Sequence, residues 1–181
     1  GRLVEDEDIG LGEQDKEQLQ AALLPTGEVA DPCREVLARE AESFEELGRG
    51  GMGVVYKGHD PLLNRSVAIK ILSQQLIGNP ESKDRFIREA QAAARLNHPN
   101  IVQVYDFGQT GDTPPLCWLL MEYVDGVTLR QVQRTGGLSS REALTLIPKL
   151  CDALQYAHEK GVLHRDIKPE NILLDAGGGV K

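Results

Sequence analysis

The 181 residues are 40% hydrophobic and 27% charged, which is close to the composition of an ordinary globular domain. The net charge of -8 is unevenly spread, because residues 1–46 hold 14 of the 28 acidic but only 4 of the 20 basic side chains. The remaining body, residues 47–181, is therefore nearly neutral. A nucleic-acid-binding domain needs a basic patch or stripe, so we predict no nucleic-acid partner.

The sequence also carries no membrane or secretion signal. No stretch approaches the roughly 18 apolar residues of a membrane helix, and the start GRLVEDEDIG lacks the basic and apolar regions of a signal peptide. The three cysteines are odd in number and have no CxxC spacing, which favours single thiols in a reducing compartment. We therefore predict a cytoplasmic location and no membrane segment in these residues.

Hydrophobic patterning divides the chain into an acidic extension, a β-rich part and a helical part. Residues 1–43 are predicted to be an acidic N-terminal extension with short helical stretches, and β-forming residues dominate from Phe44 onward. The elements predicted next are a strand, glycine loop and strand over 43–60, a strand over 66–72, a helix over 79–96, and strands over 101–108 and 116–124. This order predicts a small sheet of five strands with one helix.

The chain becomes helical after Gly126. Ser139 and Glu142 have the spacing of a capping box at the start of a helix that Gly161 closes. Pro148 lies within this helix, where a proline usually costs about 3 kcal/mol or introduces a kink. We therefore expect either a kink at Pro148 or a helix that begins near it.

The stretch from Gly48 to Gly53 matches GxGxxG, a pattern with several explanations. A dinucleotide-binding fold needs a helix directly after the glycines, and here the strand-like VVYK follows. A Walker-type phosphate loop ends in Gly-Lys-Ser/Thr, which this stretch does not. Two explanations remain: a flexible β-turn, or a hairpin whose backbone N–H groups approach a phosphate chain.

Lys70 and Glu89 are charged residues at positions where the pattern is apolar. Lys70 ends the run VAIK, and a buried lysine needs an anionic partner. Glu89 lies about 60° from Phe86 and about 40° from Ala93 around an ideal helix, which places it on the apolar stripe. We predict either a structural ion pair, or a pair in which Glu89 holds Lys70 against nucleotide phosphates.

The segment HRDIKPEN, residues 164–171, concentrates polar side chains between apolar flanks. Such a cluster is either a charged surface loop or the centre of an active site. The stretches GRGGMGVV, VAIK, MEYV and HRDIKPEN, together with Glu89, occur in the order and spacing of eukaryotic-like (Hanks-type) protein kinases. Over residues 44–181 the chain resembles the N-terminal part of a bacterial serine/threonine protein kinase.

This resemblance implies an α+β fold of the protein-kinase type. A complete small β-rich N-lobe with one main helix would span residues 44–121, followed by a hinge over 122–126 and the beginning of the helical C-lobe over 127–181. It also implies ATP and Mg²⁺ as cofactors and proteins with serine or threonine residues as substrates. Self-association for autophosphorylation is a further expectation.

The resemblance assigns a nucleotide site to two sets of residues. Those that would cover or contact the ATP phosphates are Gly48, Arg49, Gly50, Gly51, Met52, Gly53 and Lys70, with Lys70 held by Glu89. Those that would surround the adenine are Leu47, Val55, Ala68 and Leu173, the gatekeeper Met121, and the backbone groups of Glu122 and Val124.

The resemblance assigns catalytic roles within HRDIKPEN. Asp166 would accept the proton of the substrate hydroxyl, and Asn171 would hold Mg²⁺. Lys168 resembles the lysine of kinases that act on serine and threonine. Arg165 resembles an arginine that receives an activation-loop phosphate, whereas His164 is predicted to be a buried structural histidine.

Kinases of this group need a second metal ligand, the aspartate of a DFG motif, within about twenty residues of the asparagine. The printed sequence reaches Lys181 without it. We therefore expect these residues to be a part, inactive by itself, of a longer, active kinase. That kinase could carry a membrane anchor further downstream. The alternatives are a truncated, pseudokinase-like module that binds nucleotides or partners without catalysis, and a small-molecule phosphotransferase of related fold.

Overall fold

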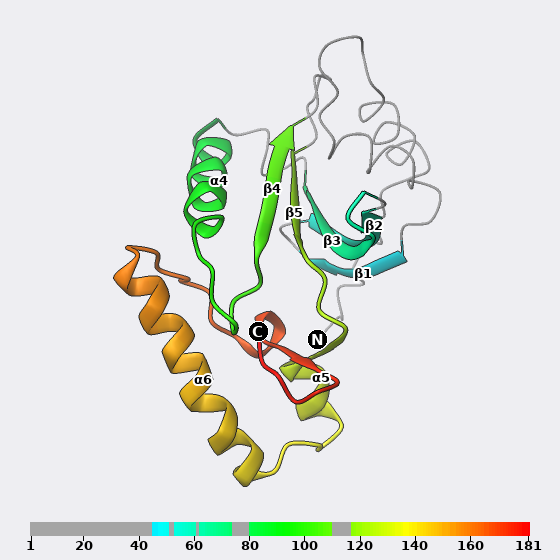
Figure 1. The fold of residues 1–181 in the computed structure, drawn as a ribbon, viewed down its shortest axis with the longest axis vertical. Helices are drawn as coiled ribbons and strands as arrows, with labels where there is room; N and C mark the ends of the chain where they lie inside the picture. The colour runs from blue at the N-terminus through cyan, green and yellow to red at the C-terminus, as the bar shows by residue number, and fades with distance from the viewer. Residues whose placement is uncertain (1–44, 51–52, 61, 74–79, 110–116) are drawn as a thin grey trace, which may run out of the picture.

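The computed structural model describes residues 45–50, 53–60, 62–73, 80–109 and 117–181 (Figure 1). The predicted extension over residues 1–43 lies outside the described residues, as do Gly51 and Met52 of the glycine loop.

A five-stranded antiparallel sheet occupies the upper part of Figure 1, with one helix, α4, beside it. The elements are β1 (Glu45–Gly50), β2 (Gly53–Asp60), β3 (Arg65–Leu72), α4 (Pro80–Ala93), β4 (Val104–Gln109) and β5 (Cys117–Glu122). The strand order is β1-β2-β3-β5-β4. Within the described residues, the predicted five strands and single helix are confirmed, although β4 begins three residues later than expected, at Val104.

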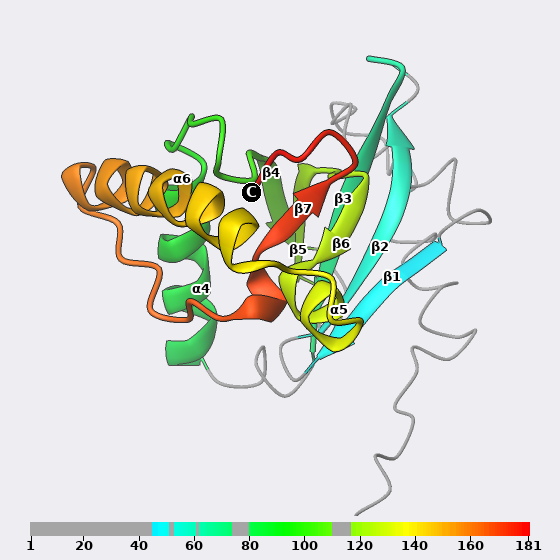
Figure 2. The same cartoon turned by 90° about the horizontal axis from the view of Figure 1, so that it is seen from below.

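Helices and a second, two-stranded sheet form the rest of the described chain, below the large sheet in Figure 1. The elements are β6 (Gly126–Thr128), α5 (Leu129–Arg134), α6 (Ser140–Glu159), a 3-10 turn η2 (Pro169–Asn171) and β7 (Leu173–Asp175). Strands β6 and β7 pair with each other (Figure 2). Residues 123–125, which have neither helix nor strand, connect the two parts.

The main core lies on one face of the large sheet. Val67, Ile69 and Ile71 of β3 are 0%, 1% and 2% exposed and pack with Trp118 and Leu120 of β5. Because successive side chains of a strand point to opposite faces, Ala68 and Lys70 must face the other side. The hydrophobic core therefore determines which face of β3 is left for a polar site.

Helix α6 begins and ends with the predicted signals. Ser139 and Glu142 form a complete capping box at its start, and Gly161 follows its end with a φ of 75°. The helix runs through Pro148 from Ser140, so the expectation that it begins near Pro148 is wrong. Pro148 is exposed, and solvent can therefore bond the carbonyl that a proline leaves without a donor.

The end of α6 is attached to the segment that links α4 to β4. The Tyr156 hydroxyl accepts a hydrogen bond of 3.3 Å from the backbone N–H of Asn97. The ring of Tyr156 also lies 5.2 Å from that of His98, centroid to centroid. These contacts join the helical part to the sheet part at a point distant from residues 123–125 in the sequence.

Replacing the cap of α6 should destabilise the fold locally. Ser139→Ala removes the hydroxyl that accepts from the Glu142 N–H at 3.2 Å, and we expect a loss of about 1 kcal/mol in the free energy of unfolding. Ser140→Ala, one residue further into the helix, is the matched control and should change it by less than about 0.5 kcal/mol. Urea melts of the two variants make the comparison, and equal losses would contradict a capping role.

Candidate active site

The pairing of the sheet brings four of the predicted nucleotide residues onto one face. Val55 of β2 lies opposite Lys70 of β3, and Ala68 of β3 lies opposite Met121 of β5. Directly opposed residues on antiparallel strands point to the same side. Val55, Ala68, Lys70 and Met121 therefore share the face opposite the main core, with Lys70 at the end nearer the glycine hairpin.

The glycine stretch forms the tip of the β1–β2 hairpin. Gly50 pairs with Gly53, and a side chain added at Gly48 or Gly50 would meet no atom within 4 Å. Gly53 is different, because its φ is 132° and an added Cβ would overlap the carbonyl oxygen of Ile71. Only glycine fits at position 53, and the exposed backbone at positions 48 and 50 is open to a ligand.

Lys70 is a half-buried cation, and the structure records no hydrogen bond or ion pair for its ammonium among the described residues. Burial lowers the pKa of Lys70, the Asp166 carboxylate acts to raise it, and the Lys168 ammonium lowers it further. The side chain is thus sensitive to the charges of the segment 164–171. A desolvated ammonium in this position favours an anionic ligand.

The predicted pairing of Lys70 with Glu89 is not formed in this structure. Glu89 is exposed, and no ion pair involving it is found among the described residues. Among the residues of α4 whose burial is described, Ala90 is the most buried, at 4%, and the side chain of Glu89 projects about 100° away from it around the helix. Phe86 and Ala93, which defined the apolar stripe, are only partly buried, so they mark its edge.

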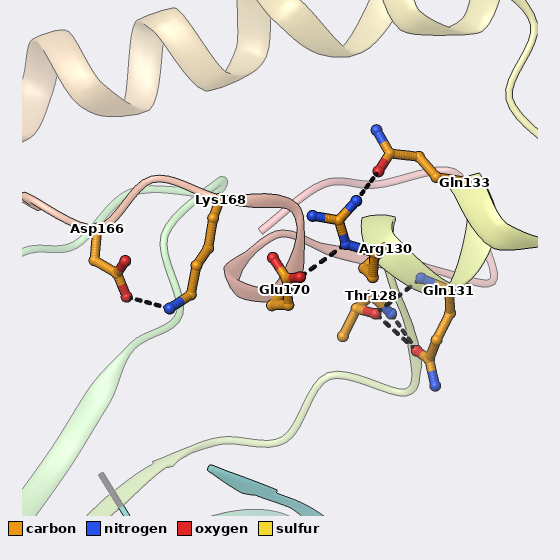
Figure 3. A network of polar contacts seen from close by, with 7 residues as sticks. All are labelled: Thr128, Arg130, Gln131, Gln133, Asp166, Lys168 and Glu170. Atoms are coloured by element: carbon orange, nitrogen blue, oxygen red, sulfur yellow. Dashed lines mark hydrogen bonds and ion pairs between the residues drawn. The ribbon is translucent and has the colours of Figure 1, made fainter. Parts of the chain in front are cut away.

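Asp166, Lys168 and Asn171 are held together by their own side chains. The Oδ2 atom of Asp166 lies 2.8 Å from Lys168 Nζ and accepts a hydrogen bond of 2.9 Å from Asn171 Nδ2 (Figure 3 draws the Lys168 contact). Asn171 Nδ2 also donates to the backbone oxygen of Asp166 at 2.8 Å. The hydrogen bond from Lys168, followed by that from Asn171, lowers the pKa of Asp166.

The loop that carries these residues is fastened to α5. Arg130 Nε contacts Glu170 Oε1 at 2.7 Å, and Glu170 belongs to the turn η2 between Lys168 and Asn171 (Figure 3). Helix α5 starts with a capping box between Thr128 and Gln131. The turn is thereby attached to a capped helix by an ion pair whose side chains are 40% and 46% exposed.

The connection between the two parts contains the residues predicted to contact the adenine edge. The Glu122 backbone N–H donates to the Gln103 carbonyl at 2.8 Å, and Glu122 also pairs with Val67 of β3. Val124 and Leu173 are both half-buried. Tyr123 lies between Glu122 and Val124 in the sequence, and the Nζ atom of Lys57 lies 4.5 Å from the centroid of its ring.

Two side chains behave differently from the sequence-based expectation. His164 is exposed, and its Nδ1 accepts from the Asp166 N–H at 3.3 Å, so the prediction of a buried histidine is wrong. The carboxylate of Glu122 contacts Lys181, a pairing that the sequence does not signal because 59 residues separate the two. Leu47, expected beside the adenine, is 43% exposed.

Comparisons with known proteins identify the family. Residues 41–181 match the protein kinase domain. The serine/threonine-protein kinase PknB of Mycolicibacterium smegmatis is 47% identical over 148 residues, which cover 80% of this chain and 24% of PknB. The serine/threonine-protein kinase PrkC of Bacillus subtilis is 44% identical over 136 residues, covering 75% of this chain and 20% of PrkC.

The fold agrees with this result. The crystal structure of the Mycobacterium tuberculosis PknI kinase domain superposes with a TM-score of 0.67 at 35% identity, covering 75% of this chain and 54% of that one. The chain belongs to the protein kinase domain family and has its fold. It spans 24% of the length of PknB, and within the described residues no helix is long and apolar enough to cross a membrane.

Removing the charge of Lys70 should stabilise the fold. Lys70→Met removes a desolvated ammonium, so we expect a melting temperature higher by about 2–4 °C at pH 7. Because the folded-state pKa is lowered, wild type gains stability as the pH rises from that pKa toward the ordinary value of 10.5, and the difference should shrink there. Thermal melts at several pH values test this, with the exposed Lys149→Met as control. A destabilised Lys70→Met protein would contradict the prediction.

Proposed function

We propose that the protein containing this chain transfers the terminal phosphoryl group of ATP to serine and threonine hydroxyls of other proteins. The observation that carries the proposal is the cluster of Asp166, Lys168 and Asn171, with one carboxylate bonded at 2.8 and 2.9 Å to an ammonium and an amide. Lys70, on the opposing sheet, is close enough for its pKa to respond to Asp166 and Lys168. A base and two cations in one place suit a reaction that moves a phosphoryl group.

The residues present fit a nucleoside triphosphate. Lys70 offers a desolvated positive charge with no partner among the described residues, and the hairpin tip offers exposed backbone at Gly48 and Gly50. Beside them, Val55, Ala68 and Met121 form an apolar surface that suits an adenine ring. We assign the phosphates to the first group and the base to the second.

The residues also fit a magnesium ion. The amide nitrogen of Asn171 makes both hydrogen bonds to Asp166, which leaves the amide oxygen as an oxygen ligand of the kind that Mg²⁺ takes. We assign this oxygen to Mg²⁺. When bound, the ion would supply positive charge that neutralises the phosphate oxygens.

Asp166 is the proposed base. Its lowered pKa keeps it ionised at neutral pH, and no bond to its Oδ1 is recorded among the described residues. The substrate hydroxyl would give its proton to Asp166 as its oxygen bonds to the terminal phosphorus, and the bond from that phosphorus to the bridging oxygen would break, releasing ADP. Lys168 would neutralise charge on the phosphoryl group during transfer.

Removing the base should abolish the transfer without unfolding the protein. Asp166→Asn keeps the shape of the side chain, and we expect the rate of phosphoryl transfer to fall by at least about 100-fold. The assay follows radioactive phosphate incorporation from ATP into the full-length protein and into a generic protein substrate. Asp152→Asn, an exposed position on α6, is the control and should keep the wild-type rate. An Asp166→Asn protein that incorporates phosphate at the wild-type rate would contradict the assignment of Asp166 as the base.

Glu89 is the proposed partner of Lys70 in the nucleotide-bound state. Because Glu89 is exposed and has no ion pair with another described residue, Glu89→Gln should change the free energy of unfolding by less than about 0.5 kcal/mol. It should nevertheless lower kcat by about tenfold or more, since the pair must form to hold the phosphates. Asp84→Asn on the same helix serves as control. Equal kcat values for the two variants would show that Glu89 has no part in the reaction.

A further inference from the structure

The carboxylate of Glu122 contacts two other segments of the chain. Its Oε1 and Oε2 lie 2.6 and 2.7 Å from Lys181 Nζ, and Oε2 also accepts from the Gln103 N–H at 3.1 Å. The backbone N–H of Glu122 donates in turn to the Gln103 carbonyl at 2.8 Å. A single residue at the end of β5 is thereby joined to the segment before β4 and to the residue that follows Val180.

This ion pair is partly shielded from solvent. The side chains of Lys181 and Glu122 are 20% and 25% exposed. In each of the other ion pairs recorded between described residues, at least one side chain is 35% exposed or more. Water and salt weaken a shielded pair less than a surface pair, so the Glu122–Lys181 pair can hold two segments together at physiological ionic strength.

Lys181 is itself held firmly by its neighbours. Its backbone exchanges hydrogen bonds of 2.8 and 2.9 Å with Leu173, and a bridge pairs Val180 with Leu174. Val180 is 1% exposed, and its carbonyl accepts from Asn100 Nδ2 at 2.7 Å. In Figure 1 this end of the chain lies directly beneath the lower ends of β4 and β5.

The contacts link the two walls of the proposed adenine slot. Met121 on β5 lies opposite Ala68, which forms one wall. Leu173, whose backbone is bonded to Lys181, is the residue that the kinase resemblance would place on the other side of the adenine, and we take it as the second wall. Glu122 follows Met121 directly, so its bond to Lys181 acts on both walls at once.

We propose that Glu122 and Lys181, supported by the hydrogen bond from Asn100 to Val180, form a clasp that sets the separation of the two walls and thereby the affinity for adenine. This proposal rests on the proposed function, because it needs an adenine nucleotide as ligand. A slot held at the correct width loses little freedom on binding, whereas a loosened slot must be ordered by the ligand. Both residues are positioning residues, since the ion pair itself does not touch the base.

The test is the binding of adenosine and of ADP to the full-length protein by isothermal titration calorimetry. We expect Lys181→Met and Glu122→Gln each to raise both dissociation constants by about fivefold to tenfold. The double variant should bind no more weakly than Lys181→Met alone, because the two residues act as a pair. Lys181→Arg keeps the charge and should bind within about twofold of wild type, and Lys149→Met should be unchanged.

Each outcome bears on a different statement. Wild-type affinity in both single variants, or additive losses in the double variant, would overturn the clasp while leaving the proposed function standing. A loss for ADP without one for adenosine would also overturn it, because the clasp acts on the adenine slot. A wild-type protein that binds neither ligand would overturn the proposed function and the clasp together. Should Lys181→Met not fold, the affinity of Glu122→Gln for adenosine and ADP tests the clasp by itself, because this variant keeps the side-chain shape and the bond from Gln103.

Discussion

Strand β3 is the constraint on which the rest of the structure depends. It pairs with β2 on one side and β5 on the other, and it buries Val67, Ile69 and Ile71 at 0–2% exposure. A strand so placed cannot shift by one residue without turning its apolar side chains to solvent. Lys70 is consequently confined to the opposite face, where its charge is partly desolvated. The polar site is the reverse side of a hydrophobic core.

The segment 164–171 is organised by different means, since it is mostly irregular and exposed. Arg165 has a φ of 63°, and the bonds from Lys168 and Asn171 gather the loop around Asp166. Glu170 ties the following turn to α5 through Arg130. The sheet is held in place by its hydrophobic core. The loop 164–171 is held in place by hydrogen bonds and an ion pair among its own polar groups. The two meet at Lys70, whose pKa is lowered by burial on the sheet and also responds to the charges of Asp166 and Lys168 in the loop.

Helix α4 is attached to the sheet by a small apolar contact. It packs on the sheet through Phe86, which contacts the buried pair Leu72 and Cys117, and Ala90 is the most buried of its residues whose burial is described. These few contacts leave Glu89 on the exposed flank.

The sequence by itself determined the elements and the family. The β-forming residues of β3, the capping box of α6 and the spacing of HRDIKPEN each depend on residues within a few positions of one another, and local patterns of that kind can be read directly. Only the tertiary structure decided which distant groups meet. Glu122 pairs with Lys181 across 59 residues, and Asn100 bonds Val180 across 80. It also decided that Glu89 faces solvent, because helical spacing restricts a side chain to a sector whereas packing selects the angle within it.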